Sequence, residues 1–437
     1  MADPLKGEDP PSQLTLLLDS NHNNRHQAPE GECKDTQLDQ TLQRLETFLT
    51  LLGFSQSSWL RLALSWTALV LLGVVLPVVV LEIFNCSDCD KYQVKWFELT
   101  IVASQAVLAA VSLLCISHCL RKYGIRRFLF VDRYSGRIVR FRNDYIKQIK
   151  DSLRLLIWWA LPCFLLKTLR EVIRMIYVRH ESWWLSFAVL VALVLSWAYV
   201  STITLTASIL FHLVCNLQVI HFDDYGRLFE RDSNVLLFME EHIRLRYHLH
   251  KISHRFRIFL LVQFIIVTTS QFVTLLELTI YSGKITVINS GDFAVVGITI
   301  SLHAATKISG RAQGITTVAS RWHALMTCSS NNSSHHRSSD SLMNFEAANR
   351  LSSLHISYSE SDFESADYVH VPTNSQLASH MASYHKRQAF VLYLQTNHGG
   401  ITIFGWMVDR DLLTTIFFIE LSLITFVLGQ TIAFSST

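Results

Sequence analysis

Long apolar runs alternate with polar stretches along this chain of 437 residues. A helix that crosses the roughly 30 Å hydrocarbon core of a bilayer needs about 20 apolar residues. Runs of that length are residues 62–81, 99–120, 155–177, 183–214, 258–281 and 412–434. A further run, residues 293–307, is shorter and carries Ser301, His303 and Thr306, so we expect protein neighbours to hold it in the membrane. The pattern predicts an all-α integral membrane protein with seven transmembrane helices.

The segments outside these runs predict how the chain is organised. Residues 1–37 are polar with few large apolar residues, which is typical of a disordered tail. In residues 38–58 apolar residues recur at helical spacing, which predicts an amphipathic helix leading to the membrane; a packed cytosolic helix has the same pattern. Residues 59–327 hold the first six transmembrane helices. We expect residues 328–380 to form a disordered, Ser-rich cytosolic loop, and residues 381–437 to hold a re-entry helix and the seventh transmembrane helix.

Basic residues concentrate between the second and third apolar runs. They are Arg121, Lys122, Arg126, Arg127, Arg133, Arg137, Arg140 and Arg142. By the positive-inside rule this loop faces the cytosol. Alternation across seven helices then predicts a cytosolic N-terminus and an extracytosolic C-terminus. The mixed-charge stretch of residues 221–257 keeps apolar residues at helical spacing, so we expect the fourth and fifth helices to extend into the cytosol.

Composition agrees with a membrane protein and narrows the function classes. Half of the residues are hydrophobic and 17% are charged, while a net charge of +3 gives no reason to expect a nucleic-acid partner. The eight cysteines lack zinc-type pairing, and the sequence has no Ser-His-Asp or phosphate-binding glycine motif. We therefore predict no metal, no cofactor and no enzyme activity. Asn85 opens an Asn-Cys-Ser tripeptide on the predicted outer side, a candidate glycosylation site of a kind that also arises by chance.

The third apolar run carries charges that transmembrane helices rarely contain. Four charged residues from Lys167 to Arg174 are spaced to share one helix face, and such charges are costly in a bilayer unless they pair or face water. This face is a candidate wall of a ligand vestibule, together with polar residues of the fourth and fifth runs. The candidate pocket residues are Lys167, Arg170, Glu171, Arg174, Tyr199 and Gln271. Alternatively, the charges snorkel towards the outer surface beside a local Lys167–Glu171 pair, and the uncharged residues form hydrogen bonds between helices.

A second unusual feature precedes the last apolar run. It consists of Gly405, Asp409, Arg410, Leu412 and Leu413, and Gln430 follows near the end of the run. The arrangement resembles the C-terminal signature of insect gustatory and odorant receptors, in which a glycine, an Asp-Arg pair and two leucines precede a last helix that ends in a glutamine. The whole chain looks like the plant gustatory-receptor-like family of that superfamily.

This resemblance implies a homotetramer in which each subunit contributes its last helix to a central cation pore. It implies that Gln430 lies in the pore and that Val427 forms an apolar gate. At about 100° per residue, Leu423 shares a helix face with both, and Glu420 and Thr431 lie on an overlapping face. The alternative is a last helix that packs in lipid or in a bundle, with Gln430 near its outer end.

The function implied by the resemblance is a ligand-gated, non-selective cation channel in the plasma membrane. Its partners would be other copies of the chain, a small-molecule ligand and the lipid bilayer. Two other functions fit the same residues. One is a non-conducting membrane receptor or scaffold that signals through its cytosolic segments, and the other is a solute transporter that uses the charged third helix.

Overall fold

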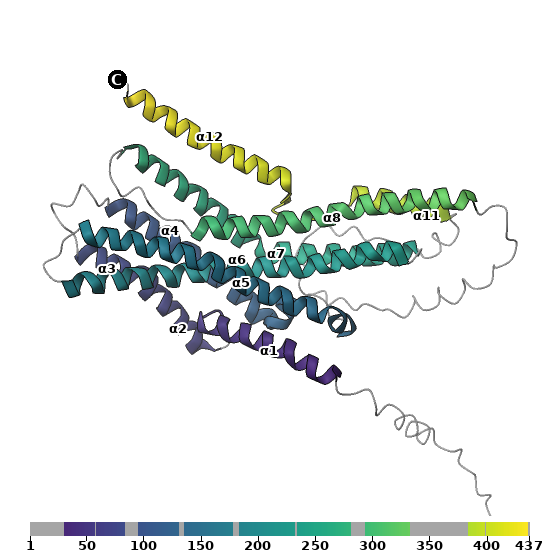
Figure 1. Ribbon diagram of the computed structural model, residues 1–437, viewed down its shortest axis with the longest axis horizontal. Coiled ribbons are helices and arrows are strands. Elements are labelled where there is room, and N and C mark those ends of the chain that lie inside the picture. The colour runs from purple at the N-terminus through teal and green to yellow at the C-terminus, as the bar shows by residue number, and fades with distance from the viewer. Residues whose placement is uncertain are drawn as a thin grey trace, which may run out of the picture. The chain divides into compact units, whose positions relative to one another are not determined.

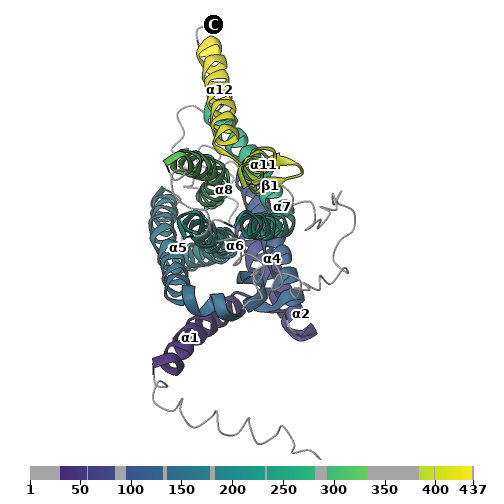
Figure 2. The ribbon, with the colours of Figure 1, turned by 90° about the vertical axis from the view of Figure 1, so that its right-hand side faces the viewer.

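The computed structural model describes residues 30–56, 58–83, 95–130, 135–177, 183–231, 234–280, 293–332, 383–397 and 399–435. The elements in order are α1 (Glu30–Leu51), α2 (Trp59–Val70), the π-helical turn η2 (Leu71–Val75), α3 (Leu76–Ile83), α4 (Lys95–Leu129), α5 (Ser135–Tyr177), α6 (Trp183–Arg231), α7 (Val235–Ile280), α8 (Phe293–Asn332), α11 (Ser383–Thr396), β1 (Thr402–Ile403), β2 (Trp406–Met407) and α12 (Arg410–Ser435). Figure 1 shows the long helices from the side, and Figure 2 shows them after a 90° turn. The prediction of a nearly all-helical chain is confirmed.

Five helices are long and apolar enough to cross a membrane among the described residues. These stretches are Trp59–Glu82, Leu99–Leu129, Phe141–Ile173, Ser186–Glu230 and Val235–Val273. They correspond to the first five predicted runs in chain order, although the third and fifth stretches end before the predicted runs do and the fourth begins at Ser186, after the predicted start at residue 183. The two other runs, residues 293–307 and 412–434, are helical as parts of α8 and α12. The count of seven membrane crossings and the orientation of the termini remain predictions.

The exposed surface of α5 illustrates how a membrane-spanning helix differs from a soluble one. Leu161, Leu165 and Leu169 succeed one another at each turn and are 59%, 58% and 57% exposed. Such a stripe would be costly in water but matches the hydrocarbon of a bilayer. We infer that this face of α5 contacts lipid.

The long helices exceed the thickness of a bilayer. Helix α6 has 49 residues and α7 has 46. At about 1.5 Å per residue each is roughly 70 Å long, more than twice the roughly 30 Å of a hydrocarbon core. Helices of this length would extend beyond a hydrocarbon core, and the extension of both into the cytosol remains a prediction.

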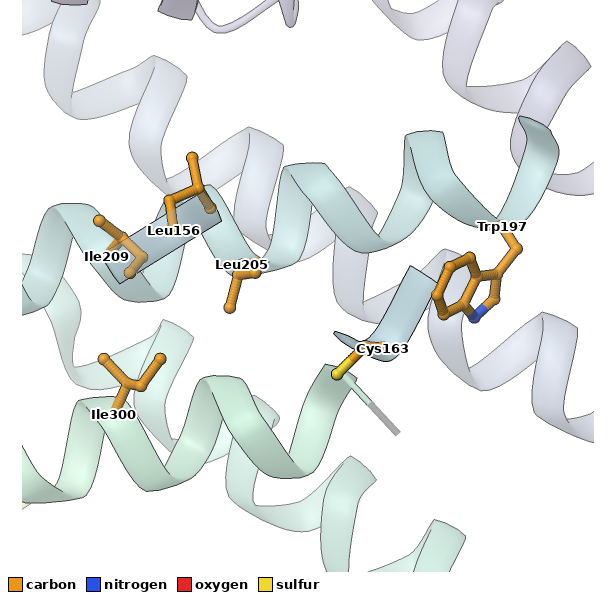
Figure 3. Packing of buried hydrophobic residues seen from close by; sticks show 6 residues of the cluster. All are labelled: Leu156, Cys163, Trp197, Leu205, Ile209 and Ile300. Carbon is orange, nitrogen blue, oxygen red and sulfur yellow. The ribbon is translucent and has the colours of Figure 1, made fainter. Parts of the chain in front are cut away.

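The chain divides into two compact units. The first comprises Met1–Leu217, Ile258–Ser301 and Leu423–Thr437, and the second comprises Gln218–Arg257 and Leu302–Ser422. Three helices contribute to the core of the first unit, which contains Leu156, Cys163, Trp197, Leu205, Ile209 and Ile300 (Figure 3). Helices α5, α6 and α8 are thus joined by packing of side chains far apart in the sequence.

Helix α1 belongs to the first unit as a packed helix. Leu42, Leu45 and Leu49 are at most 4% exposed, and α1 contacts both α4 and α5. Asp39 adds an ion pair with Arg126 of α4 at 2.7 Å, but both side chains are more than half exposed, so we expect it to contribute little. The helix begins at Glu30, before the predicted start at residue 38.

A buried polar contact joins α6, α7 and α8 within the first unit. The Gln263 side-chain amide donates to Ser208 Oγ at 3.1 Å, and both residues are fully buried. Ser301 of α8 reaches the other amide atom, Gln263 Oε1, at 3.5 Å. Gly297 makes this approach possible, because a Cβ there would lie 2.9 Å from both Gln263 Nε2 and Ser208 Oγ.

Replacing Gly297 by alanine should therefore destabilise the protein. The added methyl displaces the Gln263–Ser208 hydrogen bond, and a buried polar group left without its partner costs about 1–3 kcal/mol. Thermal unfolding of the purified protein in detergent would measure the loss. The matched control is Gly314→Ala on the same helix, where a Cβ meets nothing within 4 Å. Equal melting temperatures for the two variants would contradict this account of the contact.

The second unit has an aromatic core. Phe229 of α6, Phe238 of α7, Trp322 of α8 and Phe390 of α11 lie with ring centroids 4.6 to 6.1 Å apart in five pairs. Tyr225 donates its hydroxyl to the carbonyl of Phe238 at 2.9 Å. Rings from three other helices thus hold α11, which lies in the segment where the sequence predicts a re-entry helix.

Candidate functional site

A partly open cavity in the first unit is lined by residues of η2, α3, α4, α5 and α6. Its volume is about 60 Å³. The residues that line it are Gly73, Pro77, Leu81, Ile101, Val102, Gln105, Lys167, Arg170, Glu171, Leu193, Ser196, Trp197 and Val200. Most of these are apolar, and the three charged residues all come from α5.

The charged residues form a compact cluster at the cavity wall. Glu171 Oε1 lies 2.9 Å from Lys167 Nζ and 3.2 Å from Arg170 Nη1, so both cations contact the same carboxylate oxygen. Glu171 is only 4% exposed. The Lys167–Glu171 spacing of four residues brings the two side chains together on one face of the helix. A carboxylate this deeply buried requires such partners, because an isolated charge would be strongly disfavoured.

The wall contributed by η2 and α3 departs from regular α-helix. Residues Leu71–Val75 form a π-helical turn, in which the backbone N–H of Leu76 donates to the carbonyl of Leu71. Pro77 explains the location: it has no N–H to donate, and its ring would clash with the carbonyl of Gly73, four residues earlier. Gly73 itself packs closely against α6, since a Cβ there would lie 3.0 Å from Val200 Cγ2.

Three of the six predicted pocket residues line this cavity, namely Lys167, Arg170 and Glu171. Tyr199 and Gln271 are half-buried in α6 and α7 and are not among its lining residues. The side chain of Arg174 lies outside the described part of the structure. The sequence offers a local ion pair and a cavity wall as alternatives. In the structure Lys167 and Glu171 form the ion pair and also line the cavity.

Several lining residues were not identified from the sequence. Gln105, Ser196 and Trp197 belong to other helices, and no local pattern links them to the charged face. Gly73 and Pro77 carried a usable signal, because a glycine and a proline four residues apart in a transmembrane run indicate a distorted turn. Among the described residues, no group of three or more histidine, cysteine or acidic side chains is placed to hold a metal ion.

The motif before the last helix has a structural basis in the second unit. Strands β1 and β2 pair with Ile403 opposite Trp406, so Phe404 and Gly405 form a two-residue turn with φ of 49° and 89°. Positive φ at both positions is typical of a type I′ hairpin turn, and glycine adopts it without strain. Asp409 then caps α12, accepting a hydrogen bond from the backbone N–H of Leu412 at 2.9 Å.

Helix α12 carries the predicted pore residues. Its backbone is helical from Arg410 to Ser435. The predicted pore positions are Glu420, Leu423, Val427, Gln430 and Thr431, whose side chains lie outside the described part of the structure. Among the described side chains, Phe417, Phe418 and Phe426 are more than half exposed in the single chain. Asn85 and residues 333–380 of the predicted loop also lie outside the described residues.

The five long apolar helices and their exposed apolar side chains are typical of a polytopic helical membrane protein. The fold resembles that of the insect olfactory receptor OR5 from Machilis hrabei in complex with eugenol, with a TM-score of 0.50 and 10% identity over 90% of this chain and 98% of that chain. A second structure of the same receptor gives a TM-score of 0.50 and 11% identity over 89% and 99% of the two chains. The chain therefore has an insect-chemoreceptor-like fold.

Residues 40–419 match the profile of a family described as a protein of unknown function, DUF3537. The chain belongs to this family. A search of curated proteins gives no match.

Proposed function

We propose that this protein is a ligand-gated, non-selective cation channel of the insect-chemoreceptor type, in which four copies each contribute α12 to a central pore. The observation that carries the proposal is the shared fold, because it extends over 90% of this chain and 98% of the insect olfactory receptor chain. The Gly405–Leu413 motif directly before α12 supports it independently through its resemblance to the insect signature. The same resemblance relates the chain to the plant gustatory-receptor-like family.

The proposed pore uses one face of α12. A ring of Val427 side chains closes the pore by excluding water, and a ring of Gln430 amides offers dipoles to a partly hydrated cation. Glu420 lies about 15 Å before Gln430 along the helix and attracts cations. The rings of Phe417, Phe418 and Phe426 are exposed in the single chain. They support a location of α12 in lipid or against other subunits, because both environments shield the rings from water.

The proposed ligand site is the cavity that contains Lys167, Arg170 and Glu171. It lies among helices that would move relative to one another on gating, and a ligand that binds one conformation better shifts the equilibrium towards it. The protein would reside in the plasma membrane with its N-terminus in the cytosol and its C-terminus outside.

Planar-bilayer recordings of the purified protein would test the function. We expect discrete openings that carry Na⁺ and K⁺ about equally well and chloride much less, because an amide ring selects weakly among cations. Bilayers without protein are the control. Chloride-selective openings would contradict the proposed pore, and a silent bilayer would favour a non-conducting receptor.

A second candidate is a solute transporter, which the charged residues of the cavity favour. Ionisable side chains inside transmembrane segments frequently mark substrate pathways. Saturable uptake of a solute into proteoliposomes that is lost in Arg170→Ala would support this candidate. Bilayer recordings of the same protein should then show no discrete openings.

A further inference from the structure

We infer that the hairpin of β1 and β2 is a membrane anchor, which places the exposed rings of Phe404 and Trp406 in the headgroup layer of the lipid bilayer. The inference rests on contacts within the second unit and goes beyond the proposed channel. Because contact with lipid can be measured in a protein that carries no current, it does not depend on conduction.

The base of the hairpin is fixed to two long helices. The backbone N–H of Ile401 donates to Ser309 Oγ of α8 at 3.1 Å. The backbone N–H of Thr402 donates to Ser253 Oγ of α7, also at 3.1 Å. A further backbone hydrogen bond of 2.8 Å runs from Val408 to Ile401, and both residues are at most 1% exposed. The base is therefore buried, and the hairpin presents its tip from a fixed support.

The two faces of the hairpin differ. Met407 faces the protein, because its sulfur accepts a hydrogen bond from Gln313 Nε2 of α8 at 3.3 Å and a Cβ on Gly400 would lie 3.1 Å from it. Successive side chains of a strand point to opposite faces. Trp406 therefore points away from the protein and is 73% exposed, and Phe404 at the turn is 57% exposed. Two large rings left uncovered on a fixed element indicate contact with another surface.

Helix α7 gives the depth of the hairpin tip. Arg257 is the last charged residue before the charge-free stretch of residues 258–276, which overlaps a segment long and apolar enough to cross a membrane. A guanidinium at the end of such a run stays in the hydrated headgroup layer. The Cζ atom of Arg257 lies 5.3 Å from the centroid of the Phe404 ring. The tip of the hairpin is therefore at the depth of the headgroups.

Helices α8 and α12 agree with this depth. The apolar run of α8 ends at Lys307, just before Ser309 at the base of the hairpin. The apolar run of α12 begins at Leu412, shortly after β2 ends. The exposed apolar surface continues from the hairpin into α12, where Leu413 and Phe417 are 39% and 62% exposed. The hairpin thus lies at the level where three apolar runs begin or end.

The chemistry of the tip favours lipid headgroups as the occupant. The indole of Trp406 combines an apolar body with one N–H donor, and tryptophan is enriched at membrane–water interfaces for this reason. Phosphate oxygens of the lipid would accept hydrogen bonds from this N–H and from the guanidinium of Arg257. A second copy of the chain would also cover the rings, but it gives no reason for their position at the boundary of three apolar runs.

Depth-dependent quenching of Trp406 fluorescence would test the inference in the full chain, reconstituted into nanodiscs of phosphatidylcholine. The chain has 10 tryptophans, so the emission of Trp406 is obtained by subtracting the spectrum of Trp406→Phe from that of the wild type. The lipids carry bromine either near the headgroup end of the acyl chains or near their methyl ends. We expect the shallow bromine to quench Trp406 at least about twofold more strongly than the deep bromine, because the headgroup boundary lies roughly 15 Å from the bilayer centre.

The matched control is Trp322→Phe in the same unit. Trp322 belongs to the aromatic core and is 6% exposed, so its subtracted emission should respond to neither bromine. A second variant combines Phe404→Trp with Trp406→Phe, which returns one indole to the tip beside Arg257 and should restore the shallow quenching. Melting curves of both tip variants should match that of the wild type, because the substituted rings are exposed.

Three results would overturn the inference. Quenching by aqueous acrylamide but by neither bromine would show that the tip faces water and is open to a soluble partner. Emission that no quencher reaches would show that protein, such as a second copy of the chain, covers the rings. Strongest quenching by the deep bromine would place the tip in the hydrocarbon core.

These results are distinct from failure of the proposed function. A conducting protein whose Trp406 faces water would remove only the membrane anchor. A protein that never conducts but whose Trp406 is quenched by shallow bromine would remove only the channel.

Discussion

Replacing Glu171 by glutamine should lower the free energy of unfolding by about 3–5 kcal/mol, the usual cost of removing one partner from a buried ion pair. Lys167 and Arg170 both contact the same Glu171 oxygen, and their side chains are only 14% and 17% exposed. Without the carboxylate, two neighbouring cations would remain inside a transmembrane helix and repel each other. Unfolding of the purified protein in a denaturing detergent series would measure the change.

A nearby charge provides the control for Glu171→Gln. Asp151→Asn removes a carboxylate from an exposed position of the same helix and should change the stability by less than about 0.5 kcal/mol. The double variant Glu171→Gln with Arg170→Gln should recover part of the loss, because it removes one of the two opposed cations. Wild-type stability for Glu171→Gln would show that the ion pairs of Glu171 with Lys167 and Arg170 do not stabilise this region.

Replacing Val427 by alanine should produce a cation leak without any ligand. If four valine side chains close the pore by excluding water, smaller side chains allow water and ions to pass in the resting state. We expect the basal current to rise at least about tenfold, equivalent to about 1.4 kcal/mol of lost closure energy. The current would be recorded from equal amounts of reconstituted protein.

The opposite face of α12 supplies the control for the gate. Phe418 lies nine residues before Val427, which at about 100° per residue is about half a turn around the helix. Phe418 is 60% exposed, and Phe418→Ala should leave the basal current unchanged although it removes a larger side chain. Gln430→Ala should alter conductance without producing the same leak. If Val427→Ala and Gln430→Ala both gave the same currents as the wild type, the assigned pore face would be wrong.

The helical elements could be predicted from the sequence because the signal is local. A run of about 20 apolar residues specifies a membrane helix by itself, whatever it packs against. Helical spacing also placed Lys167, Arg170 and Glu171 on one face before any neighbour was known. The same rule predicts the extension of α6 and α7 into the cytosol, because apolar residues continue at helical spacing among the charges of residues 221–257.

The cavity could not be predicted as a whole because it depends on how four different helices are rotated about their axes. Lipid and protein are both apolar, so an apolar run does not reveal which face points inward. For this reason the sequence indicates Tyr199 and Gln271 by their polarity alone, and neither is among the residues that line the cavity. Trp197 lines the cavity, but nothing in the sequence distinguishes it from the other apolar residues of its run.

The C-terminal motif shows the opposite case, in which the sequence identified residues whose role only the structure explains. In the sequence Gly405 is part of the signature, and in the structure it occupies a turn position with a φ of 89°. Asp409 precedes an arginine in the signature, and in the structure it caps the first turn of α12. Both residues lie directly before the last helix, where a turn and a cap determine its start.

Single-particle imaging of the purified protein in detergent tests the central claim most directly. The account predicts a fourfold-symmetric particle with four copies of α12 around the axis and a pathway between them. A monomer, or a dimer with α12 at its outer edge, would contradict the proposed channel.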